Sequence, residues 1–397
     1  MSQNSFLLGK ERNSTTAIGQ KNHLNNAGAA LPNERTLAAQ IDYLVLESKI
    51  GGYEAATAKK DIAQAFYENV SQLLRCGLDE VAFVDSATRA WNTFLYSIPF
   101  SEGDKIITTS LEFGSNVVSL QDVSNRYNLD LIVVETNGDG EQLCSDITDE
   151  LDEQVRLVAI THAPAHCGTV QDVGAIGRLL STHKALYLVD ACQTVGQFDL
   201  DVTAIGCDAL VATGRKWLRG PRGTGFLYVS NNVAPCLNSV SIDLANTDWI
   251  GGAEGAKIEI AETAKKFEIW ERSIAGQIGL SQAVKYYNEL DKKGAIDHMA
   301  RLRSLLRSSL ATMPSITLYH GANCGSNVVT FYHKETTAAD IKTEMEAHNV
   351  NISVIHDWDA PWDFEQKKLP PMVRVSPHYY NTVEEIESFV EKLERLV

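Results

Sequence analysis

The sequence predicts an α/β fold in which a mostly parallel sheet is covered by helices on both faces. The first observation is that short apolar runs alternate with helical patterns from Val81 to Val229. The second is that one apolar run ends in an acid, as a buried parallel strand does when its carboxyl edge carries a functional group. The runs expected as strands are residues 81–84, 105–109, 130–134, 157–161, 185–189, 209–212 and 226–229.

The composition excludes several classes of partner. A formal net charge of −16 argues against a nucleic acid or an anionic membrane surface. Seven cysteines are scattered, odd in number and never in C-x-x-C spacing, which fits a reducing cytoplasm and provides no metal site. No stretch is apolar enough to span a bilayer. Residues 1–21 are polar, lack the apolar region of a signal peptide and are expected to form a loose arm.

The other elements follow in chain order. Residues 34–49 are patterned as an amphipathic helix, and Gly51 and Gly52 end it in an expected solvated loop. Residues 279–289 and 296–312 are expected as helices that begin a smaller C-terminal domain. The remaining expected elements are strands at 326–331 and 352–355 and a closing amphipathic helix at 382–396.

The stretch 185–229 carries the chemistry. Its first strand ends at Asp190, Gln193 follows, and after the strand 209–212 come Gly214-Arg215-Lys216 and a Gly-Pro-Arg-Gly-Thr-Gly turn. A lysine amine forms a Schiff base with pyridoxal phosphate (PLP), and an acid keeps the pyridine nitrogen protonated so that the ring accepts electrons. A buried salt bridge or a hairpin lysine would explain either residue alone. Both residues in this order, with the turn, favour the cofactor.

The junction at residues 85–89 is a candidate phosphate site. Small and hydroxyl residues, Asp-Ser-Ala-Thr-Arg, follow the first strand and open a helix that runs towards Ser97. Free backbone N–H groups and the positive end of the helix dipole suit a phosphate. A plain N-cap would look the same, but the position relative to Asp190 and Lys216 favours the phosphate.

The chain resembles the class V aminotransferase group of fold-type-I PLP enzymes, which includes cysteine desulfurases, selenocysteine lyases and isopenicillin N epimerase. The resemblance extends from about Asn22 to the C-terminus and is most specific at Asp190-x-x-Gln193 and Gly214-Arg215-Lys216. It implies an N-terminal arm (residues 1–33) that packs on the small domain, a large PLP-binding domain (34–264) and a small α+β C-terminal domain (265–397). It also implies a homodimer that acts on a small amino acid.

The resemblance assigns roles to individual residues. Lys216 and Asp190 are expected to be catalytic, and Arg374 is expected to grip the substrate's α-carboxylate bidentately. Asn26 and Tyr53 are further candidates for substrate contact. The residues expected to bind the cofactor are Asp190 at the ring nitrogen, Gln193 at the phenolic oxygen, Phe113 on the ring face, Lys216 at the aldehyde carbon, and Ala87, Thr88, Thr213 and Arg215 at the phosphate. Arg215 is also expected to lower the pKa of Lys216.

The sequence departs from the desulfurase pattern in four places. Phe113 stands where desulfurases carry a ring-stacking histidine, and Ala165 where the family often has an asparagine. Trp270 and Glu271 replace the family's Gly-Thr pair, whose threonine reaches the partner subunit's phosphate. Arg272 and Ser273 are possible substitutes for this contact. The loop 355–371 contains no cysteine, and desulfurases need a mobile thiolate there to form a persulfide.

These departures predict C–S bond cleavage without a persulfide-forming step. The predicted reaction is β-elimination from a cysteine-derived S-conjugate or sulfoxide, which gives pyruvate and ammonia, and the pattern looks most like hercynylcysteine sulfoxide lyase. The same carbanion can be reprotonated by an epimerase or an aminotransferase, so these outcomes stay open. A non-catalytic relative that acts as a scaffold is the alternative from another class.

Overall fold

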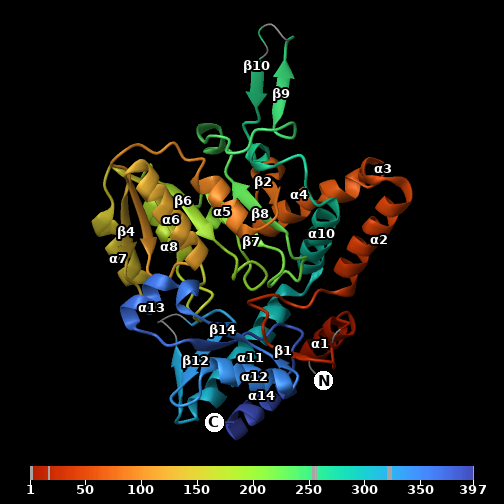
Figure 1. Cartoon of the computed structure of the whole chain (residues 1–397), viewed down its shortest axis with the longest axis vertical. Coiled ribbons are helices and arrows are strands. Elements are labelled where there is room, and N and C mark those ends of the chain that lie inside the picture. The colour runs from red at the N-terminus through yellow and green to blue at the C-terminus, as the bar shows by residue number, and fades with distance from the viewer. Residues whose placement is uncertain (1–2, 17, 253–254, 256, 320–323, 397) are drawn as a thin grey trace.

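The computed structural model describes residues 3–16, 18–252, 255, 257–319 and 324–396. Figure 1 shows the central sheet and its helices in the middle of the molecule, a hairpin projecting at one end and the C-terminal third of the chain at the other. None of the helices in these ranges is both long and apolar enough to cross a membrane.

In the described ranges, the central sheet has seven strands in the order β2-β8-β7-β6-β5-β3-β4. They are β2 (Val81–Val84), β3 (Lys105–Thr109), β4 (Asp130–Val134), β5 (Val155–Thr161), β6 (Leu186–Asp190), β7 (Ala209–Thr213) and β8 (Gly225–Val229). Strand β8 is antiparallel to β2 and β7, and the other pairings are parallel. The predicted mostly parallel sheet is confirmed.

Helices cover both faces of this sheet because side chains alternate along each strand. Ile107, Val158 and Val189 belong to one buried cluster, and their strand neighbours Ile106, Leu157 and Leu188 belong to another. The first cluster includes side chains of α4 (Lys60–Leu74), α7 (Gly140–Glu150), α8 (Val173–Leu180), α9 (Val202–Ile205) and α10 (Ile274–Glu289); the second includes those of α5 (Ala87–Leu95) and α6 (Gly114–Tyr127). The two layers fix the carboxyl ends of the parallel strands along one edge.

The C-terminal third contains a second sheet, which is antiparallel and has the order β11-β12-β15-β14. Its elements are β11 (Ile316–Tyr319), β12 (Val329–His333), β14 (Ser353–Ile355) and β15 (Met372–Val375), with α11 (Lys292–Ala311), α12 (Ala338–Ala347) and α14 (Val383–Leu396). Leu302, Phe331 and Phe389 are part of a separate apolar cluster that joins these helices to the sheet. Arg374 lies on β15 opposite Thr330 and Ser353.

Two helices differ from the sequence prediction. Gly51 has a φ of 99°, which interrupts α2 (Glu34–Ile50), but α3 (Gly52–Ala58) starts directly afterwards. The solvated loop expected there is therefore wrong. Helix α10 starts at Ile274, before its expected start, and packs against α2 and α4 rather than on the second sheet. The domain boundary at residues 264 and 265 stays a prediction.

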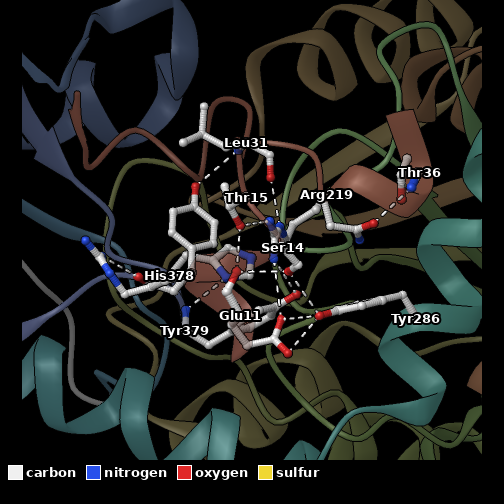
Figure 2. Close-up of polar contacts among 12 residues, drawn as sticks. Glu11, Ser14, Thr15, Leu31, Thr36, Arg219, Tyr286, His378 and Tyr379 are labelled. Carbon is white, nitrogen blue, oxygen red and sulfur yellow. Dashed lines mark hydrogen bonds and ion pairs between the residues drawn. The ribbon is translucent and has the colours of Figure 1, made fainter. Parts of the chain in front are cut away.

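The N-terminal segment is not the loose arm that the sequence predicted. Helix α1 (Gln3–Asn13) carries Glu11, whose fully buried carboxylate accepts the Tyr286 hydroxyl at 2.8 Å and lies 3.6 Å from the guanidinium of Arg219 (Figure 2). Arg219 is also fully buried and donates through Nε to the Leu31 carbonyl at 2.8 Å. A buried ion pair needs both partners. Arg12 on the same helix pairs with Glu385 at 2.9 Å, so charged side chains that the sequence analysis did not single out hold this polar helix in place.

The next part of the N-terminal segment, residues 22–25, pairs with residues of the C-terminal third. Strand β1 (Asn22–His23) is parallel to β13 (Val350–Asn351), and Asn25 forms a bridge with Ser376. Because Arg219 comes three residues after Lys216, the N-terminal segment holds the turn that contains Lys216 and the C-terminal third together.

The projecting hairpin was not expected from the sequence. It consists of β9 (Thr247–Ile250) and β10 (Lys257–Ile260), which pair in antiparallel fashion at the top of Figure 1. Trp249, Ile250 and Ile258 on it are exposed. The remaining helical turns are η1 (Leu78–Glu80), η2 (Ala234–Cys236), η3 (Ala264–Phe267), η4 (Asp357–Asp359) and α13 (Pro361–Lys367).

Candidate active site

A pocket of about 230 Å³ lies at the carboxyl edge of the central sheet. All eight residues that the sequence suggested for cofactor binding line it: Ala87, Thr88, Phe113, Asp190, Gln193, Thr213, Arg215 and Lys216. The lining also contains Asp85, Ser86, Asn116, Thr161, Ala163, Ala165, Cys192, Arg222 and Gly223. Strand ends far apart in the sequence meet here because parallel strands end at a common edge.

Lys216 follows β7 and is 9% exposed. Within the described residues, no hydrogen bond or ion pair holds its amine. Burial lowers the pKa of Lys216 to about 8, and the positive charges of Arg215 and Arg374 act in the same direction. The expected effect of Arg215 is present, but burial is the larger cause. An amine with this pKa is partly unprotonated near neutral pH and can attack a carbonyl carbon.

Asp190 ends β6, and donors from the chain fix its carboxylate. Oδ2 accepts the side-chain amide of Asn116 at 2.9 Å, and Oδ1 accepts the backbone N–H of Cys192 at 2.9 Å. Sequence reasoning missed Asn116, although its spacing of four residues from Glu112 on a helix start was a usable signal. A buried, oriented carboxylate of this kind suits a protonated ring nitrogen.

Gln193 is oriented by two contacts of its side-chain amide. Its Oε1 accepts the indole N–H of Trp217 at 2.7 Å, and its Nε2 donates to the Ala27 carbonyl at 3.1 Å. An amide nitrogen has two protons, so one of them remains for a ligand oxygen in the pocket. Phe113 lines the same pocket as the N-cap residue of α6.

The start of α5 forms the end of the pocket that suits an anion. Ser86 caps the helix by accepting the backbone N–H of Arg89 at 3.1 Å. A Cβ on Gly225 would lie 2.6 Å from the Ala212 carbonyl oxygen and 3.3 Å from the Ala87 nitrogen. Any side chain at Gly225 would therefore push apart the strand and the helix start. The donors at the helix start fit a phosphate group.

The expected phosphate contacts of Thr213 and Arg215 are partly engaged by the chain. The Thr213 hydroxyl donates to the Thr224 carbonyl at 3.3 Å in this structure. To donate to a phosphate it would have to give up this contact, because it has a single proton, and its predicted phosphate contact stays a prediction. Arg215 donates one N–H to the Gly28 carbonyl at 2.8 Å and keeps its other donors. Arg222, which sequence reasoning missed, lines the same pocket and is close enough to lower the pKa of Arg215.

The two substitutes considered for the cross-subunit phosphate contact are engaged within their own chain. Arg272 pairs with Glu268 at 2.7 Å. The Ser273 hydroxyl caps α10 by accepting the Gly276 N–H at 2.9 Å. Arg215 and Arg222 therefore supply the positive charge for this pocket from the same chain.

Arg374 approaches the pocket from β15. It donates to the carbonyl of Ala165, a pocket residue, at 3.0 Å and to the side-chain oxygen of Asn25 at 3.3 Å. Its buried Nε has no partner within the described residues. Burial lowers the pKa of Arg374 to about 10, and Asp359 acts against this shift. A guanidinium held by neutral acceptors can exchange them for a carboxylate.

The two other substrate candidates lie outside the pocket. Asn26 is fully buried, and its amide nitrogen donates to the Ser376 carbonyl at 2.7 Å while its oxygen accepts the Tyr380 hydroxyl. The chain itself uses both ends of this amide, and the residue ties the N-terminal segment to the C-terminal third. The expected substrate contact of Asn26 stays a prediction. Tyr53 on α3 is 76% exposed and lines a neighbouring groove.

The loop 355–371 packs over the pocket rim. A Cβ on Gly114, next to Phe113, would lie 1.9 Å from the Trp358 carbonyl oxygen, so the loop touches the start of α6. Asp363 on α13 pairs with His166 at 2.9 Å and with Lys367 at 2.7 Å. These partners hold the pKa of Asp363 at about 2 against the effect of burial. His166 is therefore part of the loop's anchor, in line with a satisfied loop histidine.

The pocket as a whole fits PLP. It offers an unpartnered lysine amine, an oriented carboxylate, one free amide proton and a helix start with two arginines. Gly225, whose Cβ would collide with the Ala212 carbonyl oxygen, lets strand β8 lie close to the start of α5. These are the groups that an aldehyde, a pyridine nitrogen, a phenolic oxygen and a phosphate require.

Comparison with known proteins supports this fit. The sequence profile of the family described as aminotransferase class-V matches residues 22–389. A probable cysteine desulfurase of Methanothermobacter thermautotrophicus is 30% identical over 356 residues, which cover 87% of this chain and 86% of the relative. An apo cysteine desulfurase of Thermococcus onnurineus superposes with a TM-score of 0.90 at 21% identity over 98% of each chain.

C-DES, described as a cystine C–S lyase, shares the fold as well. Its variant with glycine covalently linked to the PLP cofactor superposes with a TM-score of 0.86 at 18% identity, over 96% of this chain and 98% of that one.

The desulfurase relatives correct the function predicted from the sequence. The sequence predicted elimination from an S-conjugate or sulfoxide to pyruvate and ammonia and excluded a persulfide-forming desulfurase. Relatives that are named cysteine desulfurases contradict this prediction. The exclusion was wrong because it rested on side chains that differ from the desulfurase pattern, above all the missing cysteine in the loop 355–371. The residues predicted to receive an amino acid, Lys216, Asp190 and Arg374, all lie in or beside the pocket.

Proposed function

Because the chain belongs to the class V aminotransferase family and its cofactor is pyridoxal 5′-phosphate, we propose that it is an enzyme that removes the sulfur of L-cysteine and leaves alanine. The observation that supports this most directly is the buried, unpartnered amine of Lys216 in one pocket with Asp190 and Gln193. The names of its relatives supply the substrate. The proposed reaction also cleaves a C–S bond, as the sequence predicted, but the sulfur passes to a thiol.

The residues of the chain divide the work. PLP, when bound, supplies a sink for the electrons left at the α-carbon. Arg374 holds the α-carboxylate and so fixes which bond of the α-carbon faces the ring. Lys216, once its amine is free, takes and returns the α-proton. Asp190 keeps a proton on the ring nitrogen, and Gln193 donates its remaining amide proton to the phenolic oxygen.

The sulfur acceptor in this proposal is a dissolved thiol. Cysteine and a thiol R–SH give alanine and the persulfide R–S–SH, so that one sulfur atom moves and no oxidant is needed. Cys192 lines the pocket, but burial and the neighbouring Asp190 raise the pKa of its thiol well above the ordinary value. A neutral thiol is a poor nucleophile, and the loop 355–371 has no cysteine.

We expect the PLP-loaded enzyme to form alanine from L-cysteine at a rate that rises with the concentration of added dithiothreitol. Sulfide should appear in equal amount, because excess dithiol reduces the persulfide. Alanine is measured by amino acid analysis and sulfide by colorimetry. Pyruvate and ammonia in place of alanine would contradict the proposal.

A second candidate is an aminotransferase, which the cysteine-free loop and the family itself favour. In that case an amino acid leaves as its keto acid, the cofactor ends as pyridoxamine phosphate, and an added α-keto acid completes the cycle. The same assay separates the candidates, since transamination of cysteine needs the keto acid and forms no sulfide.

We also propose that the enzyme is a homodimer whose second copy covers the groove beside the pocket. This groove has a volume of about 1460 Å³ and shares Asp85 and Gly223 with the pocket lining. Leu244, Trp270 and Tyr53 line it and are strongly exposed. Exposed apolar side chains gathered in one groove are typical of a protein interface, and a copy seated here would border the phosphate end.

We expect light scattering to give twice the chain mass for the natural protein and the single mass for Leu244→Asp. Leu244 is 79% exposed, so the change does not disturb the folded chain, but it places a charge in the interface. The matched control is Val118→Asp, on α6 outside the groove, where an apolar residue is 69% exposed. A natural protein that stays at the single mass at micromolar concentration would contradict the homodimer.

A cytoplasmic location is part of the proposal. Cys76, Cys144, Cys167, Cys192, Cys207 and Cys236 are free thiols in the structure, which is usual for proteins of reducing compartments. The predicted closeness to hercynylcysteine sulfoxide lyase and isopenicillin N epimerase stays a prediction.

A further inference from the structure

A second carboxylate, Glu112, lies directly behind Asp190. It is fully buried at the end of the loop that follows β3, and donors from three elements surround it. Its Oε1 accepts the Phe113 N–H at 2.9 Å and the Thr161 hydroxyl. Its Oε2 accepts the Thr161 N–H at 3.1 Å and the Thr108 hydroxyl at 3.5 Å. Several hydrogen-bond donors therefore surround Glu112, although Glu112 does not line the pocket.

Asn116 joins the two carboxylates. Its amide nitrogen donates to Glu112 Oε1 at 2.8 Å and to Asp190 Oδ2 at 2.9 Å. Because this nitrogen has two protons, each carboxylate receives one of them. Asn116 itself is buried, with 2% of its surface exposed. The orientation of Asp190 and the state of Glu112 are therefore coupled through a single side chain.

Charge couples the two acids as well. In the described part of the chain no cation pairs with Glu112; Asp190 on β6 is the charged group that acts on it, and its donors from β3, β5 and α6 are neutral. Burial, and then the charge of Asp190, raise the pKa of Glu112 to about 7. A proton on Glu112 removes the repulsion between the two carboxylates, and a proton on the cofactor ring nitrogen offsets the charge of Asp190. Protonation of Glu112 and of the ring nitrogen therefore influence each other.

We propose that Glu112 is a positioning residue that acts through Asn116 to set how firmly Asp190 holds the proton of the PLP ring nitrogen. When Glu112 is ionised, its negative charge favours the proton on the ring. When Glu112 is protonated, this support is lost. The inference concerns the cofactor of the family and therefore holds for either candidate reaction.

The test is the Glu112→Gln variant, which keeps the shape and an acceptor oxygen but removes the charge. The visible absorption of the bound cofactor is titrated with pH, and the rate of cofactor loss is measured by transfer to a scavenging apo-enzyme. Loss of a negative charge disfavours protonated forms, so we expect the spectral midpoint to fall by about one pH unit, which corresponds to a tenfold change. Cofactor loss is expected to be about tenfold faster by the same reasoning.

The apo-protein offers a readout that does not depend on the cofactor. An acid whose folded pKa of about 7 lies above its ordinary value of 4.5 adds stability below pH 4.5, and this stability is lost as the pH rises through 7. Urea unfolding of the natural apo-protein should show this loss, and Glu112→Gln should remove it. A variant that fails to bind PLP therefore still tests the ionisation of Glu112.

Two controls separate positioning from general damage. Asp208→Asn removes another largely buried acid with a raised pKa, which accepts the Tyr187 N–H at 2.8 Å at the opposite edge of the sheet, and it should leave the spectral midpoint in place. In an Asn116→Ala background, Glu112→Gln should shift the midpoint less than in the natural protein. An unchanged midpoint in Glu112→Gln, or an equal shift in both backgrounds, would overturn the proposal.

Discussion

Replacing Lys216 by alanine is expected to lower kcat by roughly 10⁴-fold, the upper end of what one positioned proton-transfer group contributes. The side chain is the only lysine that lines the pocket among the described residues, and no contact within the chain occupies its amine. Without it, the cofactor has no amine to bind covalently and the α-carbon has no base. Steady-state alanine formation measures the loss, and the absorption band of the lysine Schiff base should be replaced by that of the free PLP aldehyde.

The pH dependence of the natural enzyme belongs to the same prediction. The amine reacts only when unprotonated, and the pKa of Lys216 is lowered to about 8. The rate at which apo-enzyme captures PLP should therefore rise as the pH increases and level off above about pH 8. A capture rate that does not change between pH 6 and 9 would contradict the assigned role.

Lys266 provides the matched control. It is buried as well, and burial lowers the pKa of its amine. Its amine, however, donates to the carbonyls of Ala234 (2.6 Å) and Leu237 (3.2 Å) away from the pocket. Lys266→Met should cost stability, because two carbonyls lose their donor, and should leave the cofactor absorption intact. Added methylamine should restore part of the activity of Lys216→Ala and none of the stability of Lys266→Met.

The central sheet could be predicted because buried parallel strands are continuous apolar runs. The residues at the ends of these strands followed from the topology, which brings Asp190 and Lys216 into one pocket. Neither the helix α1 nor the hairpin of β9 and β10 gave such a signal. The helix is held by ion pairs with residues distant in the sequence, Glu11 with Arg219 and Arg12 with Glu385, and the hairpin leaves its apolar side chains exposed.

The sequence could not predict which of two adjacent asparagines faces the site. Asn25 accepts a hydrogen bond from Arg374, whereas the side chain of Asn26 donates to the backbone carbonyl of Ser376. Glu112 is an ordinary acid in the sequence, and its importance arises from burial behind Asp190. The predicted function failed for a related reason: an absent cysteine was given more weight than the residues that are present.

We propose that Arg374 decides which amino acids the enzyme accepts. Its guanidinium is 7% exposed, and its partners, the Ala165 carbonyl and the Asn25 amide oxygen, are neutral. A substrate carboxylate that displaces them gains a charge-assisted bidentate contact in a buried site. Removing one partner of such a buried pair costs about 2 to 5 kcal/mol, which at 1.4 kcal/mol per factor of ten is at least about 30-fold in affinity.

We therefore expect Arg374→Gln to lower kcat/KM for L-cysteine by at least about 30-fold and Arg374→Lys to lower it less, since lysine keeps the charge but loses the fork geometry. Cysteamine, which is cysteine without its carboxylate, distinguishes recognition from damage. The natural enzyme should bind cysteamine poorly, and the variants should bind it no worse than the natural enzyme does. If Arg374→Gln weakens cysteamine and cysteine equally, the guanidinium supports the fold and not the carboxylate, and another group must orient the substrate for Lys216.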